Sequence, residues 1–167
     1  MQEMLIYGVS FDLVGKQPIV LLKTAEGNKF LPIWIGINEA NAIALKITGM
    51  TPERPITHDL LANILGAVDI NVDRIVVTSL ANEVFYARIL AHADGRQMEI
   101  DSRPSDALAL AVRTSAPIFA ADDVIEESAI EFEGEEVEDT EQVVDKFKEF
   151  LDNVTPEDFA QGEGEEP

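Results

Sequence analysis

Two short segments combine charge, proline and hydroxyl groups in a pattern that could carry chemistry. Residues 54–59 read Arg-Pro-Ile-Thr-His-Asp, and residues 101–106 read Asp-Ser-Arg-Pro-Ser-Asp. Each segment places an Arg-Pro step just before a predicted helix start, where free backbone N–H groups and the helix dipole favour an anion. Arg54 and Arg103 are therefore predicted to bind phosphate, with Ser105 in the same phosphate-binding set.

The same segments contain side chains suited to metal binding and proton transfer. Asp59, Asp101 and Asp106 offer the oxygen ligands that Mg²⁺ or Mn²⁺ prefers. His58 can act as a general base or acid near neutral pH. The candidate catalytic set consists of these three aspartates, His58 and Glu39, which lies at the start of an earlier predicted helix. The combination suits phosphodiester hydrolysis, which needs charge neutralisation and an activated water.

Purely structural roles stay open for the same residues. An aspartate in the first turn of a helix, such as Asp59 or Asp106, meets the helix dipole favourably whether or not it binds an ion. Arg54 and Arg103 could pair with neighbouring aspartates across the junctions, and His58 could be an exposed residue at a helix start.

Hydrophobic periodicity indicates the elements that must position these residues. Residues 5–13 alternate, with Leu5, Tyr7 and Val9 on one predicted face, which indicates a half-buried strand. Tight turns follow, so the first part of the chain is predicted to form an antiparallel meander of three strands, over residues 5–13, 19–24 and 30–37. Apolar residues at 40, 43, 44 and 47 then predict an amphipathic helix, and Thr57 is predicted to cap a second helix over residues 58–65.

The same order of three strands followed by a helix is then predicted a second time, after residue 72. Three more strands are predicted over residues 73–80, 84–92 and 96–101, with Asp94-Gly95 as a hairpin turn. A helix with Pro104 near its start follows. The two strand-to-helix junctions can be overlaid so that Ile35 matches Ile100 and Ala42 matches Ala107. The predicted fold class is α+β, with two βββα-like units forming a mainly antiparallel sheet packed with helices.

The net charge of −20 is concentrated near the C-terminus. Residues 1–120 hold ten basic and thirteen acidic side chains, whereas residues 121–167 hold two and nineteen. The chain is therefore predicted to have a folded domain over residues 1–128 and an acidic helical tail. This tail comprises an acidic linker over 129–139, an amphipathic helix over 140–160 and a disordered end over 161–167.

Composition excludes several classes of protein. So acidic a chain is not a general-purpose binder of nucleic acid or anionic membranes, because such binding rests on basic residues. Without cysteine it has no disulfide framework, thiolate zinc site or cysteine nucleophile. It contains no apolar run of membrane-spanning length and no basic segment at Met1, so we expect no membrane association and a cytoplasmic location.

At the two junctions the sequence resembles the bifunctional nuclease domain family. The resemblance is carried by residues 31–36 (Leu-Pro-Ile-Trp-Ile-Gly) with Glu39, residues 54–60 (Arg-Pro-Ile-Thr-His-Asp-Leu) and residues 100–107 (Ile-Asp-Ser-Arg-Pro-Ser-Asp-Ala). It runs from about residue 4 to about residue 128, and residues 144–151 and 156–159 look like the actinobacterial branch. The resemblance implies a compact α+β domain, often oligomeric, with activity on DNA and RNA. Among the candidate residues, seven stand at positions where the resemblance implies a functional role: Glu39, Arg54, His58, Asp59, Asp101, Arg103 and Asp106.

Two functions follow as expectations. The first is a nuclease that hydrolyses phosphodiester bonds in DNA and RNA with Mg²⁺ or Mn²⁺, acting as a homo-oligomer, with a dimer favoured. The second is a non-enzymatic regulatory or binding module. Its acidic tail would recruit a protein partner or control access of nucleic acid.

Overall fold

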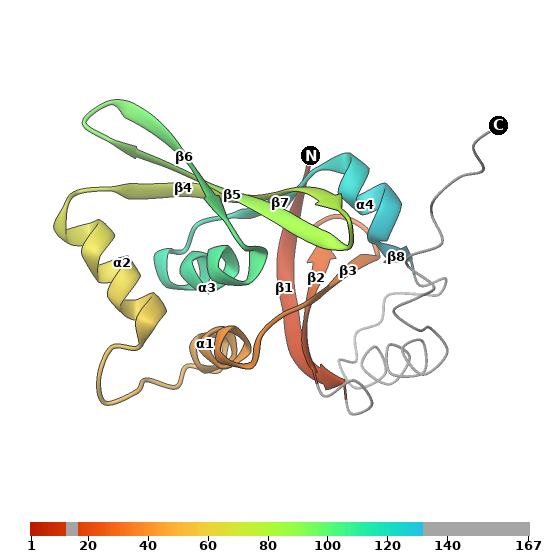
Figure 1. Ribbon diagram of the computed structural model, residues 1–167, viewed down its shortest axis with the longest axis horizontal. Helices are drawn as coiled ribbons and strands as arrows, with labels where there is room; N and C mark the ends of the chain where they lie inside the picture. Colours follow the sequence, from red (N-terminus) through yellow and green to blue (C-terminus); the bar gives the residue numbers. More distant parts are fainter. Residues whose placement is uncertain (13–16, 132–167) are drawn as a thin grey trace.

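The computed structural model describes residues 1–12 and 17–131 (Figure 1). The predicted amphipathic helix and tail end, and most of the acidic linker, lie outside these residues. The described elements, in chain order, are β1 (Gln2–Asp12), β2 (Gln17–Thr24), β3 (Lys29–Trp34), α1 (Ile37–Ile47), α2 (Thr57–Ala67), β4 (Asn71–Ala81), β5 (Val84–Ala93), β6 (Arg96–Ser102), α3 (Pro104–Thr114), β7 (Ile118–Ala120), α4 (Asp122–Ser128) and β8 (Ile130–Glu131).

The strands form one sheet in the order β6-β5-β4-β7-β1-β2-β3-β8. The predicted meanders, β1-β2-β3 and β4-β5-β6, are both antiparallel. Strand β7 lies between them, parallel to β4 and antiparallel to β1, and so joins the two halves into a single sheet. The predicted α+β class with a mainly antiparallel sheet is confirmed. Strands β7 and β8 were not predicted, because segments this short contain too little alternation to be recognised.

The single face predicted for the first strand is divided between two clusters: Tyr7 packs against a second buried cluster that contains Phe30, and Val9 packs against the main core. Met4 is buried and Ile6 packs against the core, whereas Leu5 is 54% exposed. A bulge between Ile6 and Gly8 then shifts the register against β2, so that Val9 also packs against the main core. Because a bulge moves side chains to the other face of a strand, uninterrupted alternation cannot describe both of its ends.

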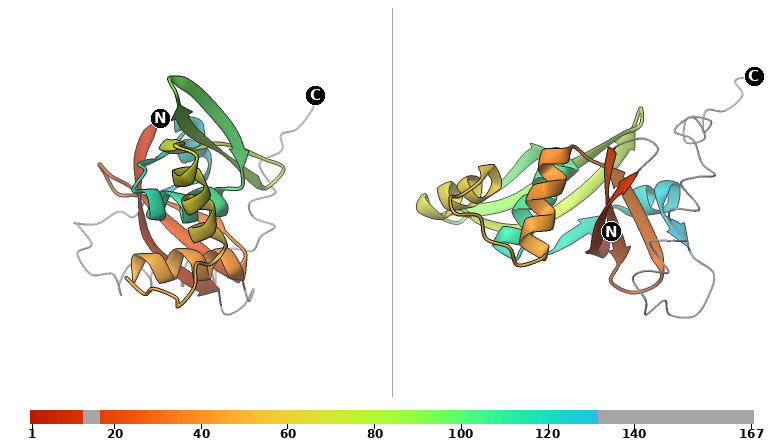
Figure 2. Two further views of the ribbon diagram at one scale, coloured as in Figure 1. Left: turned by 90° about the vertical axis from the view of Figure 1, so that its left-hand side faces the viewer. Right: turned by 90° about the horizontal axis from the view of Figure 1, so that it is seen from below.

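Helix α3 lies between the sheet and the other two helices near the junctions. It packs on β4 and β5 on one side and on α1 and α2 on the other (Figures 1 and 2). Residues 107–111 of α3 (Ala-Leu-Ala-Leu-Ala) are all buried, and the small alanines let the neighbouring elements approach closely. Pro104 occupies the first helical turn, where its missing N–H costs nothing, and Ser115 ends the helix in a left-handed conformation.

The helix starts correct two details of the sequence prediction. Ile56, not Thr57, is the N-cap of α2, and the Asp59 carboxylate accepts the Ile56 N–H at 3.0 Å. Helices α1 and α3 begin at Ile37 and Pro104, so their starts lie two residues further apart in the chain than the overlay that matches Ala42 with Ala107. Each of α1, α2 and α3 thus has an acidic residue at its third position, where the helix dipole favours it.

Candidate active site at three helix N-termini

Side chains from the starts of α1, α2 and α3 meet in one ion-pair network, the junction cluster, which consists of Glu39, His58, Arg103 and Asp106. Glu39 and Asp106 are the third residues of α1 and α3, His58 is the second residue of α2, and Arg103 is the N-cap of α3. Residues separated by up to 67 positions in the chain are brought together because these three helices pack with their starts at one place.

Asp106 is the centre of the junction cluster. Its Oδ1 lies 2.9 Å from Nε2 of His58, and its Oδ2 accepts from Nε and Nη2 of Arg103, both at 2.8 Å. Because a carboxylate only accepts, the proton of a neutral His58 lies on Nε2 and leaves Nδ1 as the basic nitrogen. The His58 side chain is 10% exposed, so packing and Asp106 both restrain the ring.

Glu39 forms a second ion pair with the Arg103 guanidinium. Its Oε1 accepts from Nη2 of Arg103 at 2.7 Å. This hydrogen bond, followed by one from its own backbone N–H, lowers the pKa of Glu39, and the hydrogen bonds to Glu39 and Asp106 raise the pKa of Arg103. A Cβ at Gly36 would overlap the Glu39 carboxylate, so any other residue at this position would displace that carboxylate from its present place. Arg103 itself is 64% exposed, and Nη1 has no partner among the described residues.

Asp59 belongs to a second, separate ion pair. Its Oδ1 accepts from Nε of Arg113 at 2.6 Å, and the Arg113 side chain is only 5% exposed. The hydrogen bond from the Ile56 backbone and then the Arg113 contact lower the pKa of Asp59. Sequence reasoning missed Arg113, although a lone arginine in the last turn of an apolar helix is a signal for a buried partner.

Asp101 lies on the opposite face of the sheet from the junction cluster. It is paired with Arg88 across β5 and β6, and its Oδ1 is 3.4 Å from Nη1 of that arginine. The neighbours Ala87 and Ile89 are buried on the face that α3 covers, and side chains alternate along a strand. Asp101, which is 70% exposed, therefore points away from the three helices.

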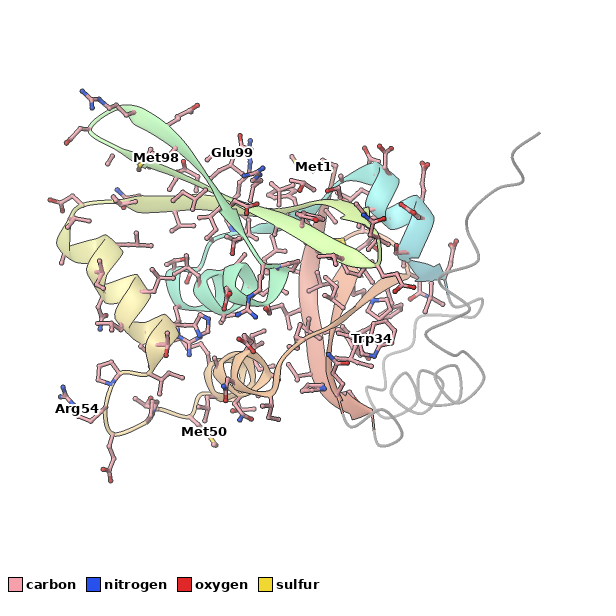
Figure 3. The ribbon with its side chains drawn as sticks, viewed as in Figure 1. Met1, Trp34, Met50, Arg54, Met98 and Glu99 are labelled. Atoms are coloured by element: carbon pink, nitrogen blue, oxygen red, sulfur yellow. The ribbon has the colours of Figure 1, made fainter. Side chains whose placement is uncertain are left out.

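The remaining predicted phosphate-binding residues also lie apart from the junction cluster's ion pairs. Arg54 is exposed on the loop between α1 and α2, has no ion-pair partner among the described residues, and points away from the body (Figure 3). Ser105, the second residue of α3, is buried at 5% exposure.

The predicted metal ligands do not form one ligand set. Asp59 is engaged by Arg113, Asp101 by Arg88, and Asp106 by His58 and Arg103. Within residues 1–12 and 17–131, no group of three or more His, Cys, Asp or Glu side chains is placed to hold a metal ion. As folded here, these three carboxylates do not fit a single Mg²⁺ or Mn²⁺.

The fold and the junction cluster define a two-unit α+β domain with a histidine–aspartate–arginine network at its helix starts. The model of the bifunctional nuclease domain family matches residues 20–133, and the chain belongs to this family.

Two curated relatives extend the similarity almost to the ends of the chain. Uncharacterized protein MT1877 of Mycobacterium tuberculosis strain CDC 1551 / Oshkosh and uncharacterized protein Rv1829 of strain ATCC 25618 / H37Rv are each 37% identical over 164 residues. The match covers 95% of this chain and 98% of each relative, so it includes most of residues 132–167. Among the described residues, no helix is long and apolar enough to cross a membrane.

Proposed function

We propose that the chain is a cytoplasmic nuclease that hydrolyses phosphodiester bonds in DNA and RNA at the junction cluster. Membership of the bifunctional nuclease domain family supports the reaction class. The observation that carries the assignment of the site is the bridging position of Asp106, which contacts both a histidine suited to proton transfer and an exposed arginine. In this proposal the fold places a general base, His58, beside a residue that binds phosphate, Arg103.

Arg103 binds the scissile phosphate in the proposal. Its guanidinium is charged at all relevant pH values, is 64% exposed and has Nη1 free of partners among the described residues. Glu39 and Asp106 fix its orientation, so little side-chain entropy is lost when a phosphate oxygen binds at Nη1. The starts of three helices add partial positive charge at the same place. Negative charge that accumulates on the phosphate in the transition state is stabilised by these groups.

His58 moves the proton. With Asp106 accepting at Nε2, Nδ1 of His58 takes a proton from the attacking water, and Asp106 stabilises the imidazolium that forms. The proton then leaves through His58 to solvent or to the departing oxygen. Asp106 is a positioning residue in this scheme, because it acts on His58 and Arg103 and not on the phosphate.

Mg²⁺ or Mn²⁺ remains a proposal as a cofactor. Such an ion would polarise the phosphate and lower the pKa of a bound water. The three carboxylates predicted to bind it are held by different partners, so the proposed roles of Arg103 and His58 do not depend on such an ion.

The test is cleavage of end-labelled single-stranded DNA and RNA by the purified full-length chain, with Mg²⁺, with Mn²⁺ and with a chelator. Arg103→Gln is expected to lower kcat/KM by about 100-fold, since one transition-state donor is worth roughly 10²–10³ in rate. Arg88→Gln is the matched control, because Arg88 is also an exposed arginine with two carboxylate partners but lies on the other face of the sheet. Equal cleavage by wild type, Arg103→Gln and Arg88→Gln would identify a contaminating nuclease and refute the proposal.

One observation favours the non-enzymatic module as the second candidate. Arg103 already has two carboxylate partners and Arg113 has one, so both positive charges are matched without a ligand. The acidic tail would then recruit a basic protein partner or gate nucleic acid. Absence of cleavage under all three ionic conditions, together with oligonucleotide affinity that rises when residues 132–167 are deleted, would favour this function over the nuclease.

A further inference from the structure

Strands β2 and β3 are buried on both of their faces. On one face, Val20 and Leu22 of β2 pack with Ile43 of α1 in the main core. Side chains alternate along a strand, so the residues between them point to the opposite face, which we call the outer face. Ile19 and Phe30 on the outer face are 0% exposed. They belong to the second buried cluster, which consists of Ile19, Leu21 and Phe30, with Tyr7, Trp34 and Ile130 packed against them.

No described helix contributes to the second buried cluster. All of its apolar residues in the described part of the chain come from β1, β2, β3 and β8. The buried residues of α4, Val124 and Ile125, belong to the main core instead. Residues 13–16 have to join Asp12 to its pairing partner Gln17, so they are too few to cover the strands. A single layer of strands cannot exclude water from both of its faces, so a further layer is required on the outer face.

We infer that residues 140–160 of the same chain form this layer, with the apolar side of their predicted helix packed on the outer face. The apolar residues of this segment recur at intervals of three and four, which places them on one side of a helix: Val144, Phe147, Leu151 and Val154. At 1.5 Å per residue, this apolar stripe extends over about 15 Å of helix. The outer face extends over about 13 Å along β3 from Phe30 to Trp34, at 3.3 Å per residue. The apolar stripe and the second buried cluster therefore match in length.

The described part of the chain ends beside the outer face. Ile130 of β8 pairs with Phe30 and packs against the second buried cluster. Residues 132–139 can span up to about 26 Å at 3.3 Å per residue. The distance across the sheet from β8 past β3 and β2 to β1 is only about 14 Å, at 4.8 Å per strand. The segment can therefore reach every strand of the outer face, whereas the exposed apolar side chains of α2 lie at the other end of the molecule (Figure 1).

The charges of the two surfaces are complementary. Strands β2 and β3 contain Lys23 and Lys29 and no acidic residue, whereas residues 140–160 contain six acidic and two basic side chains. Lys23 lies on the outer face, where its Nζ is 5.8 Å from the centroid of the Phe30 ring. With its apolar side on the strands, the segment turns its acidic side to solvent, on the face of the sheet away from the junction cluster. This inference does not depend on the nuclease proposal.

The first test is acrylamide quenching of Trp34 fluorescence in the full-length chain. Trp34 is the only tryptophan, and it packs against the second buried cluster. Leu151→Asp places a charge on the apolar side of the segment, and because a carboxylate is not buried without a partner, the quenching constant is expected to rise at least about twofold. Asn153→Asp is the matched control, since it adds the same charge on the polar side and should leave quenching unchanged. Far-UV circular dichroism checks that both variants are folded.

The second test is energy transfer from Trp34 to a thiol-reactive naphthalene dye at a single cysteine, which is direct because the chain has none of its own. Dye at Asn153→Cys is expected to accept much more energy than dye at Val68→Cys, an exposed position at the end of α2, and the transfer should not change on dilution.

Three results would overturn the inference. The first is equal transfer to the dye at positions 153 and 68, which would show that the segment does not lie on the outer face. The second is equal quenching of Trp34 in wild type and folded Leu151→Asp. The third is transfer to the dye at position 153 that falls on dilution, which would assign the outer face to the segment of another copy of the chain.

Discussion

Replacing Arg113 with methionine removes the most buried charge that ties the helices together. Its Nε donates to Asp59 at 2.6 Å, Nη1 to the Ala109 carbonyl at 2.8 Å and Nη2 to the Ala42 carbonyl at 3.0 Å. One side chain of α3 thereby contacts both α1 and α2. Methionine preserves the length and most of the volume of the arginine stem, so the change tests the polar contacts and not the packing.

The expected loss of stability follows from the exposure of the two partners. Removing one partner of a fully buried pair costs roughly 3–5 kcal/mol, because the other charge is left buried without compensation. Asp59 is 26% exposed and still accepts the hydrogen bond from the Ile56 N–H in the variant. Water and this hydrogen bond therefore compensate part of the cost of leaving its charge without Arg113. We therefore expect Arg113→Met to lower the free energy of unfolding by about 2–3 kcal/mol.

Urea unfolding at pH 7, followed by circular dichroism, measures this loss. Arg88→Met is the matched control, since its pairs with Glu99 and Asp101 are 3.6 and 3.4 Å long and exposed. It is expected to cost at most about 1 kcal/mol. A double-mutant cycle with Asp59→Asn isolates the pair, because asparagine still accepts the Ile56 N–H. Equal losses for Arg113→Met and Arg88→Met, or a coupling free energy near zero in the cycle, would refute the buried ion pair.

Three further outcomes can be measured on the same protein. Gly36→Ala keeps an allowed backbone conformation but displaces the Glu39 carboxylate from Arg103, so cleavage should fall about 10- to 100-fold with little change in Tm. Asp101→Asn should retain wild-type cleavage within about twofold, because Asp101 lies on the other face of the sheet; a loss as large as that for Asp106→Asn would instead support the three-carboxylate metal site. The lowered pKa of Asp59 adds stability that is present above its ordinary value of 3.8 and is lost as the pH falls through the lower folded value. The difference in unfolding free energy between wild type and Asp59→Asn should therefore narrow from pH 7 to pH 3, and a constant difference would contradict the pKa shift.

The elements that the sequence predicts well are those with long, regular patterns. Strands β2 to β6 and helices α1 to α3 lie within a few residues of their predicted positions, because each of them is marked by alternation, by helical spacing or by an apolar run between two turns. The first strand was found but its face was not, since the bulge before Gly8 leaves no mark in the alternation. Strand β7, with three residues, depends on the tertiary pairing of β1 and β4 and has no local signal of its own.

The candidate site was predicted in part. Arg103 and Asp106 are three residues apart at one helix start, so proximity in the sequence implies proximity in space. His58 and Glu39 join them only through the packing of three helices, which no local pattern contains. Asp101 shows the opposite case: it is close to Arg103 in the chain, but it is still in β6, where alternation turns it to the far face.

If the junction cluster performs phosphodiester hydrolysis, as proposed, Asp106→Asn should abolish most of the cleavage. This substitution changes one atom of the side chain and removes the charge that bridges His58 and Arg103. The measurement is kcat/KM for labelled DNA and RNA, with wild type, Asp106→Asn and Arg88→Gln purified side by side. We predict at least about a 100-fold loss for Asp106→Asn and none for Arg88→Gln. Cleavage by Asp106→Asn at the wild-type rate would contradict the proposal.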